Sequence, residues 1–234
     1  MMFTAHKKSA LILLLLLIPG IVFGQALIGG HIGLSLSSLS GDKDNDENSL
    51  RVGINPYISL DFPINYIISV ETGISYAMQG MTRKRVTQDG LSVITTTTDY
   101  KLDYIQVPVY LKENFTNFYG KIGAYGAYAV NAVENWEKSE SKYGVITNTK
   151  DINVDFPKSI NMYDIGISIG FGYIHYFTQK RRRSNSRRRV SKVLQVNLRY
   201  DLGFVPLDLT GTNSDLDIRN RMFSIGLSLN TILD

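Results

Sequence analysis

Tyr163-Asp-Ile-Gly-Ile-Ser-Ile-Gly-Phe-Gly-Tyr173 is the stretch that decides the fold of this chain. Bulky apolar residues occupy every second position, and Asp, Gly and Ser fill the positions between them. A period of two is typical of a β-strand, because successive side chains point to opposite faces. The bulky face has tyrosine at both limits, as a membrane-crossing strand has between two interfacial belts of aromatic residues. The stretch predicts a strand with one apolar face and one small, polar face.

The same alternation recurs along the chain, and no window has good helical periodicity. We expect eight strands, at residues 31–37, 50–62, 66–78, 93–111, 118–130, 162–174, 194–204 and 223–230. The connections between them alternate between short and long. Residues 63–65 and 112–117 form short turns, and we expect long polar loops at 40–49, 79–92, 131–159 and 205–218. This pattern predicts an all-β, eight-stranded, antiparallel up-and-down transmembrane β-barrel.

A soluble barrel that binds a small ligand in the periplasm is the main alternative. Such a barrel turns its apolar residues inward and its charged residues outward. Here the polar face consists mainly of Gly, Ser and Asn, which suit the narrow interior of an eight-stranded barrel. The bulky Ile, Leu, Phe and Tyr of the other face suit contact with lipid. The chemistry of the two faces therefore favours the membrane barrel.

Residues 1–24 have the three-part pattern of a secretory signal peptide. A basic start with Lys7 and Lys8 precedes an apolar run that ends at Pro19, and small residues follow. The run is shorter than the roughly 20 residues of a spanning helix. We therefore expect export with cleavage of residues 1–24, and residues 25–234 as the barrel domain, in the outer membrane.

Three segments resemble a known family: Ile68–Gly80, Asp103–Lys112 with Pro108 in its middle, and the glycine-rich Tyr119–Tyr128. The family is the PorT-like, or porin-family, outer-membrane β-barrel domain of Bacteroidota. The resemblance implies an outer-membrane barrel without general enzymatic activity. It supplies no motif of functional residues, and one member type is linked to protein secretion.

Four charged residues on the predicted inner face could meet across the narrow lumen: Glu71, Lys121, Arg199 and Asp201. Buried charges need partners, so we expect an interior ion-pair network with a structural role that plugs the lumen. An outer-membrane lipid-modifying hydrolase is a further alternative. His31 is predicted inside the barrel and His175 outside it, so the two are poor partners for one catalytic site. No nucleophile motif or metal-ligand spacing is present, and we expect neither catalysis nor a cofactor.

Residues 180–192 contain eight basic residues and no acidic one. The arginines of this segment are Arg181, Arg182, Arg183, Arg187, Arg188 and Arg189. Strand counting places the segment in a periplasmic turn, where it is either a solvated insertion or a docking turn. The docking turn would bind anionic lipid headgroups or an acidic periplasmic partner.

The high overall pI of about 9.1 comes from this segment and the leader. Of 25 basic residues, two lie in the leader and eight in residues 180–192, which leaves 15 against 21 acidic residues. Nucleic acid is therefore not an expected partner. The sequence predicts an outer-membrane barrel with a structural or protein-interaction role, linked to secretion or the envelope, whose membrane partner is outer-membrane lipid. It leaves the oligomeric state open.

Overall fold

The computed structural model describes residues 26–40, 47–90, 92–143, 145–155, 161–178, 190–207 and 218–232. The strands in these ranges are β1 (Leu27–Ser40), β2 (Glu47–Ile54), β3 (Tyr57–Pro63), β4 (Ile68–Asp89), β5 (Ser92–Asn114), β6 (Phe118–Lys142), β7 (Val145–Asp155), β8 (Tyr163–Thr178), β9 (Val190–Gly203) and β10 (Arg219–Ile232). No helix among the described residues is long and apolar enough to cross a membrane. The expected signal peptide, residues 1–24, lies outside the described residues.

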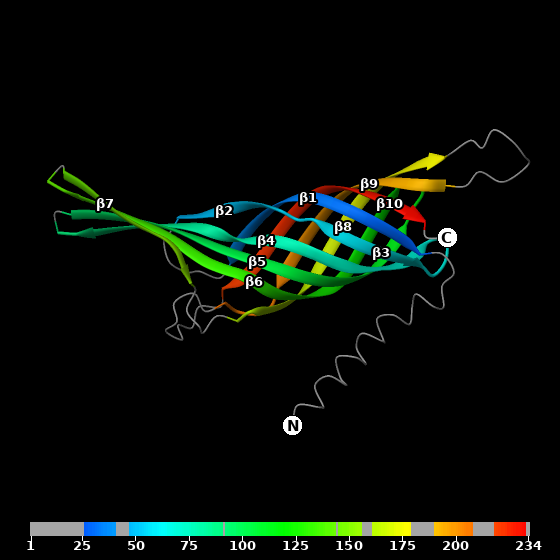
Figure 1. Cartoon of the computed structure of the whole chain (residues 1–234), viewed down its shortest axis with the longest axis horizontal. Helices are drawn as coiled ribbons and strands as arrows, with labels where there is room; N and C mark the ends of the chain where they lie inside the picture. The colour runs from blue at the N-terminus through cyan, green and yellow to red at the C-terminus, as the bar shows by residue number, and fades with distance from the viewer. Residues whose placement is uncertain are drawn as a thin grey trace, which may run out of the picture.

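The strands close into one ring because the first and last of them pair with each other (Figure 1). β1 and β10 are antiparallel, with a register that runs from Leu27↔Ile232 to Ser40↔Arg219. Around the ring the order is β1, β2 with β3, β4, β5, β6, β8, β9 and β10. β7 lies outside this path and pairs with β6. The expected eight-stranded, antiparallel, up-and-down barrel is confirmed, with β2 and β3 sharing one of the eight places.

Asn55 and Pro56 separate β2 from β3, which together form one of the eight strands of the ring. β2 pairs with β4 only as far as Leu50↔Met81, and β3 resumes the pairing at Tyr57↔Ser75. Proline has no N–H to donate to a ladder, so strand pairing is interrupted where it stands. Between the two paired segments, the Tyr76 N–H donates to the Pro56 carbonyl oxygen at 2.9 Å. The chain thus crosses the wall as one bent strand.

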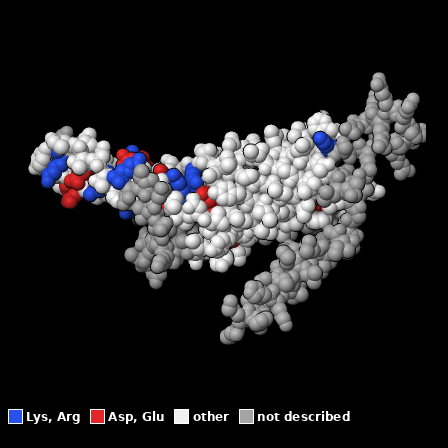
Figure 2. Space-filling view, viewed as in Figure 1, with Lys and Arg blue, Asp and Glu red and all other residues white. Residues whose placement is uncertain are grey.

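The two faces of the wall differ in chemistry as the alternation predicts. Ile32 on β1 and Ile165 on β8 point outward and are 66% and 59% exposed. On the inner face of the same strands, Ser35 and Ser168 are completely buried. Figure 2 shows the barrel body almost free of Lys, Arg, Asp and Glu on the visible side. The outer face is therefore an apolar band, and polar side chains are turned into the lumen.

Aromatic contacts mark both edges of this band on β6 and β8. The rings of Tyr128 and Tyr163 lie 5.1 Å apart near one edge, and those of Phe118 and Tyr173 lie 5.4 Å apart near the other. Strand residues rise by about 3.3 Å each, so the interval from Phe118 to Tyr128 corresponds to about 33 Å of strand. At a tilt of about 40° this is about 25 Å, the height of the apolar band of a transmembrane barrel.

The interior is less uniformly small than expected. Three tyrosines, Tyr104, Tyr110 and Tyr119, are among the largest fully buried side chains. Glycines on a neighbouring strand give such rings their space. A side chain at Gly172 would collide with the ring of Tyr119, and one at Gly166 with the ring of Tyr125. Large residues thus pack against small ones on the neighbouring strand inside the narrow barrel.

The expected long loops at 79–92 and 131–159 are wrong for most of their length. β4 runs on to Asp89 and pairs with β5 up to Asp89↔Ser92, and β6 continues to Lys142. β6 then turns into β7, with a register from Lys142↔Val145 to Val133↔Asp155. These extensions form one sheet that projects from the barrel mouth (Figure 1). We call it the projecting sheet: residues 81–89, 92–100, 133–142 and 145–155.

Candidate functional site

Four charged side chains from four strands meet inside the barrel, and we call them the interior cluster: Asp61, Glu71, Lys112 and Lys121. The Lys112 ammonium lies 2.8 Å from Asp61 Oδ2 and 3.3 Å from Glu71 Oε2. The Lys121 ammonium lies 2.7 Å from Glu71 Oε1. Each side chain is at least nine-tenths buried. Glu71 therefore joins two lysines, and Lys112 joins two carboxylates.

A second ion pair lies on β9, where Arg199 and Asp201 point to the same face. Their Nη2 and Oδ2 atoms are 3.1 Å apart. The Ser168 hydroxyl donates to Asp201 Oδ1 at 2.5 Å, and Tyr110 Oη lies 3.1 Å from the Ser168 hydroxyl. The Tyr110 ring also lies beneath the Lys121 ammonium, which is 4.3 Å from the ring centre. Tyr110 and Ser168 thus connect the interior cluster to the Arg199–Asp201 pair.

The four residues singled out from the sequence all lie in the lumen, in two separate ion pairs: Glu71 with Lys121, and Arg199 with Asp201. Sequence reasoning missed Lys112 and Asp61. Lys112 was assigned to a turn at 112–117, but β5 continues to Asn114 and turns Lys112 inward. Asp61 shares the inward face of Tyr57 and Ser59, so the alternation alone could have identified it.

The charges of the interior cluster and of the Arg199–Asp201 pair balance. Lys112, Lys121 and Arg199 face the carboxylates of Asp61, Glu71 and Asp201. Aromatic faces provide further contacts, since Lys112 lies 4.6 Å from the ring centre of Tyr119. Burying this many charges is tolerable only because each has a partner and most hydrogen bonds are made.

A cluster of buried apolar side chains lies near the mouth from which the sheet projects. Leu207 and Ile218, which flank the connection between β9 and β10, are each 1% exposed. They form an isolated antiparallel bridge, in which the Leu207 N–H donates to the Ile218 carbonyl oxygen at 2.8 Å. Both pack in a cluster with Met81, Leu102 and Tyr104. The interior thus has ion pairs near the chain ends. Toward the projecting sheet, apolar side chains surround the buried carboxylate of Asp164, which accepts hydrogen bonds from the Tyr125 hydroxyl at 3.1 Å and the Asn220 amide at 3.0 Å.

His31 and His175 lie on opposite faces of the wall. His31 Nε2 is 2.6 Å from the Ser59 hydroxyl inside the barrel. His175 is exposed on the outer face, with its ring 5.0 Å from that of Phe177. Among the described residues no group of three His, Cys, Asp or Glu side chains could hold a metal ion.

Arg51 occupies the interruption of the ladder beside Asn55 and Pro56. Its guanidinium donates to the Gln79 carbonyl oxygen and lies 3.1 Å from Asp103 Oδ1. The Asn131 amide donates to the other carboxylate oxygen of Asp103 at 2.9 Å. These polar groups replace the missing strand pairing on the mouth side of the barrel.

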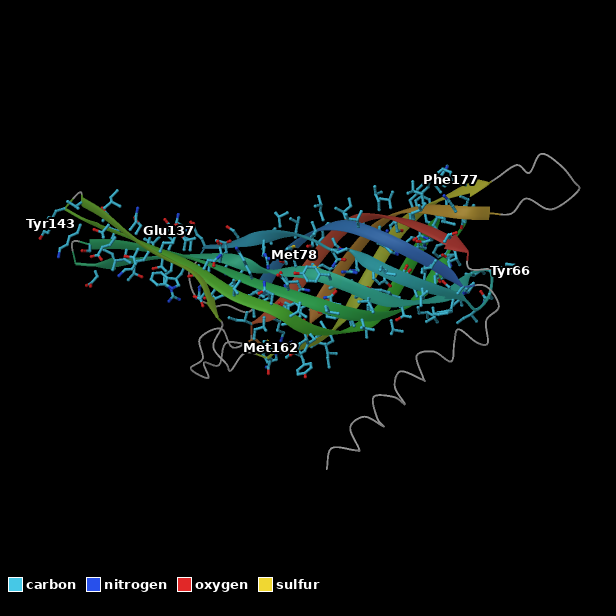
Figure 3. The ribbon with its side chains drawn as sticks, in the orientation of Figure 1. Tyr66, Met78, Glu137, Tyr143, Met162 and Phe177 are labelled. Atoms are coloured by element: carbon cyan, nitrogen blue, oxygen red, sulfur yellow. The ribbon has the colours of Figure 1, made fainter. Side chains whose placement is uncertain are left out.

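The projecting sheet carries most of the charged residues visible in Figure 2. Figure 3 shows Glu137 and Tyr143 on it, at the opposite end of the molecule from Tyr66 and Phe177. At its tip, Tyr143, Val145 and Ile146 are 76%, 66% and 66% exposed. Tyr143 has a φ of 50°, which the tight turn between β6 and β7 imposes. Burial raises the pKa of Glu134 near the base of the sheet.

One edge of the projecting sheet is formed by β7. β7 pairs with β6 on one side, and no other described strand lies along its second side. The side chains of residues 145–150 are all exposed. An edge of this kind presents backbone N–H and C=O groups to any extended chain that approaches.

The six arginines of the predicted docking turn, Arg181–Arg183 and Arg187–Arg189, lie outside the described residues. The strands that they connect are described. Thr178 at the end of β8 pairs with Val190 at the start of β9. That pair lies at the end of the barrel opposite the projecting sheet (Figure 1).

Comparison with known proteins gives a family match and several likenesses of fold. A family model described as outer membrane protein beta-barrel domain matches residues 23–208. Ail, the attachment invasion locus protein of Yersinia pestis, is 14% identical with a TM-score of 0.37, over 89% of this chain and 99% of that one. Neisserial surface protein A is 14% identical with a TM-score of 0.38, over 88% and 97%. At these TM-scores the likenesses carry no argument about function. No curated protein matches.

Proposed function

The chain belongs to the outer membrane protein β-barrel domain family, and on that premise we propose that it is a protein-interaction component of the outer membrane. Its place in the outer membrane excludes the soluble periplasmic barrel that the sequence left open. Within the family we assign it to the PorT-like type of Bacteroidota. The Pro108 strand and the glycine-rich strand after it support that assignment.

The projecting sheet carries the proposal. Outer-membrane barrels have short turns on the periplasmic side and longer connections outside the cell. The turns at 64–67 and 115–117 lie at the end opposite the sheet, which therefore faces the exterior. A rigid barrel that holds a long, exposed sheet away from the membrane is suited to present a binding surface.

The free edge of β7 specifies the kind of partner. An extended segment of another protein can add to such an edge as a further strand through backbone hydrogen bonds. The exposed Tyr143, Val145 and Ile146 beside it supply apolar contacts. We therefore take the partner to be a protein with an extended segment.

The proposal includes neither catalysis nor conduction. A catalytic site needs its groups within hydrogen-bond reach, and His31 and His175 are on opposite sides of the wall. Ser59, which contacts His31, is 1% exposed, so a lipid ester has no access to it. The ion pairs of the interior cluster and the apolar cluster at the mouth support a plugged lumen.

Site-specific photocrosslinking in living cells tests the interaction. A photoreactive residue at Thr147 or Thr149, both exposed on β7, is expected to give a discrete protein adduct. The matched control is Ile167, which is exposed on the lipid-facing side of β8 and should give no protein adduct. Adducts with lipid alone at all three positions would contradict the proposal.

We also propose the basic segment 180–192 as a periplasmic docking turn for anionic headgroups or an acidic protein, on its charge alone. Replacing its six arginines by Gln should reduce capture by a photoreactive residue at Ser184 and leave the barrel folded. If the variant gives the same adducts and the same membrane fractionation as the wild type, the segment is a solvated insertion.

A further inference from the structure

A small cavity lies inside the barrel beside the two ion pairs. Its volume is about 30 Å³. A space of roughly 10–15 Å³ on this measure already holds one water molecule, so the cavity has room for about two waters or for one larger monoatomic ion. Its polar lining comes from five strands and from the junction between β2 and β3: His31, Asn55, Tyr57, Lys121, Asn197, Arg199 and Ser224.

Two hydrogen-bond donors in this lining lack a partner: Asn55 Nδ2 and Arg199 Nε. Asn55 is 5% exposed and Arg199 is 7% exposed, so bulk water reaches neither atom. The orientation of the Asn55 amide is fixed, because its Oδ1 accepts a hydrogen bond from Arg199 Nη2 at 3.1 Å. Both free atoms are donors, and the guest that satisfies them must be an acceptor.

The charges around the cavity favour a negative guest. Lys121 and Arg199 line it, whereas their carboxylate partners Glu71 and Asp201 do not. Among the described lining residues there is no carboxylate. Two cations and two free donors around a low-dielectric space stabilise an anion more than a neutral molecule.

We propose that this cavity binds one small monovalent anion of the size of chloride. Asn55 Nδ2 and Arg199 Nε donate to it, and the Lys121 ammonium contributes charge. The anion would connect β9 to the bend between β2 and β3, where the strand ladder is interrupted.

Crystals of the refolded full chain grown in bromide test the site directly. We expect an anomalous peak inside the cavity, within hydrogen-bond distance of Asn55 and Arg199. Density without an anomalous signal would show that water alone fills the cavity, and would overturn the proposal. The wild-type protein suffices for this measurement.

Halide-dependent stability is the second test. Unfolding in urea is followed by heat-modifiable gel mobility. The urea midpoint in chloride is compared with that in gluconate at the same ionic strength. At ten times the dissociation constant, chloride should lower the unfolding equilibrium constant about elevenfold. In Asn55→Asp the new carboxylate supplies the negative charge itself, and the halide effect should vanish.

The matched control is Asn65→Asp. Asn65 lies in an exposed turn, and its Oδ1 accepts from the N–H groups of Ile67 and Ile68, which an aspartate also allows. This variant should keep the full chloride response. An equal response in Asn55→Asp and the wild type would overturn the proposal. If Asn55→Asp does not fold, the bromide peak in the wild type decides.

Discussion

Lys112 holds two carboxylates together from inside the barrel wall, with its ammonium 2.8 Å from Asp61 and 3.3 Å from Glu71. Lys112→Met would leave Asp61 buried without a cation, while Glu71 would keep Lys121. Breaking a buried pair in this way costs about 3–5 kcal/mol, because an uncompensated charge remains. We expect the free energy of unfolding in lipid vesicles, measured with urea, to fall by that amount.

The double variant Lys112→Met with Asp61→Asn should recover much of the loss, since it removes the stranded charge. Lys142→Met, an exposed residue on the projecting sheet, is the matched control and should change stability little. A single variant at Lys112 as stable as the wild type would contradict a structural role for the interior cluster.

Glu134 gives the projecting sheet a pH dependence. Burial raises the pKa of its carboxyl, so the folded sheet takes up a proton more readily than the unfolded sheet. Between the ordinary pKa and the raised one, stability therefore falls as pH rises. Amide hydrogen exchange on β6 and β7, corrected for its intrinsic pH dependence, should show greater protection at acidic pH. Glu134→Gln should remove the difference in protection between acidic and neutral pH. Protection that rises with pH in the wild type would contradict the prediction.

At the scale of elements, the ring and the projecting sheet are separable. β6 pairs with β8 from Phe118↔Tyr173 to Tyr128↔Tyr163, entirely before the residues that pair with β7. Replacing residues 135–153 by Asn-Gly should therefore leave a closed barrel with folded gel mobility. Gly166→Leu is the contrasting variant, because its side chain would collide with Tyr125 and the backbone at Leu202 inside the ring. Loss of folding in the hairpin variant would show that the ring depends on the sheet.

The same division explains what the sequence could predict. Inside the membrane one face of a strand meets lipid and the other the lumen, so β8 alternates clearly and its place follows from the sequence. In the projecting sheet the side chains of residues 84–89 on β4 are all exposed, and residues such as Thr95–Thr98 on β5 show no alternation. Polar sequence there predicted a loop. Asp61 and Lys112 meet across β4, through the registers Asp61↔Glu71 and Ser69↔Lys112. These registers depend on where the strands end, which periodicity does not define.

For the whole molecule, the proposed plug of the lumen has two parts. The interior cluster lies toward the chain ends, and Leu207 and Ile218 pack in the apolar cluster toward the projecting sheet. Tyr104, Tyr110 and Tyr119 are among the largest fully buried side chains of the described residues. An eight-stranded barrel has only enough interior for its own side chains, so no continuous water path is expected.

Planar bilayer recordings measure this closure. The wild-type protein, inserted at high salt, should give no steady conductance steps. Removing the rings in a Tyr104→Ala, Tyr110→Ala, Tyr119→Ala variant clears three large side chains from the lumen, and small conductance steps should appear if the variant keeps its folded gel mobility. Replacing Tyr66, Tyr163 and Tyr173, which are exposed on the outside, by Ala is the matched control and should stay silent. Steady steps from the wild type would mean that the interior side chains leave a path open, and the proposed plugged lumen would be wrong.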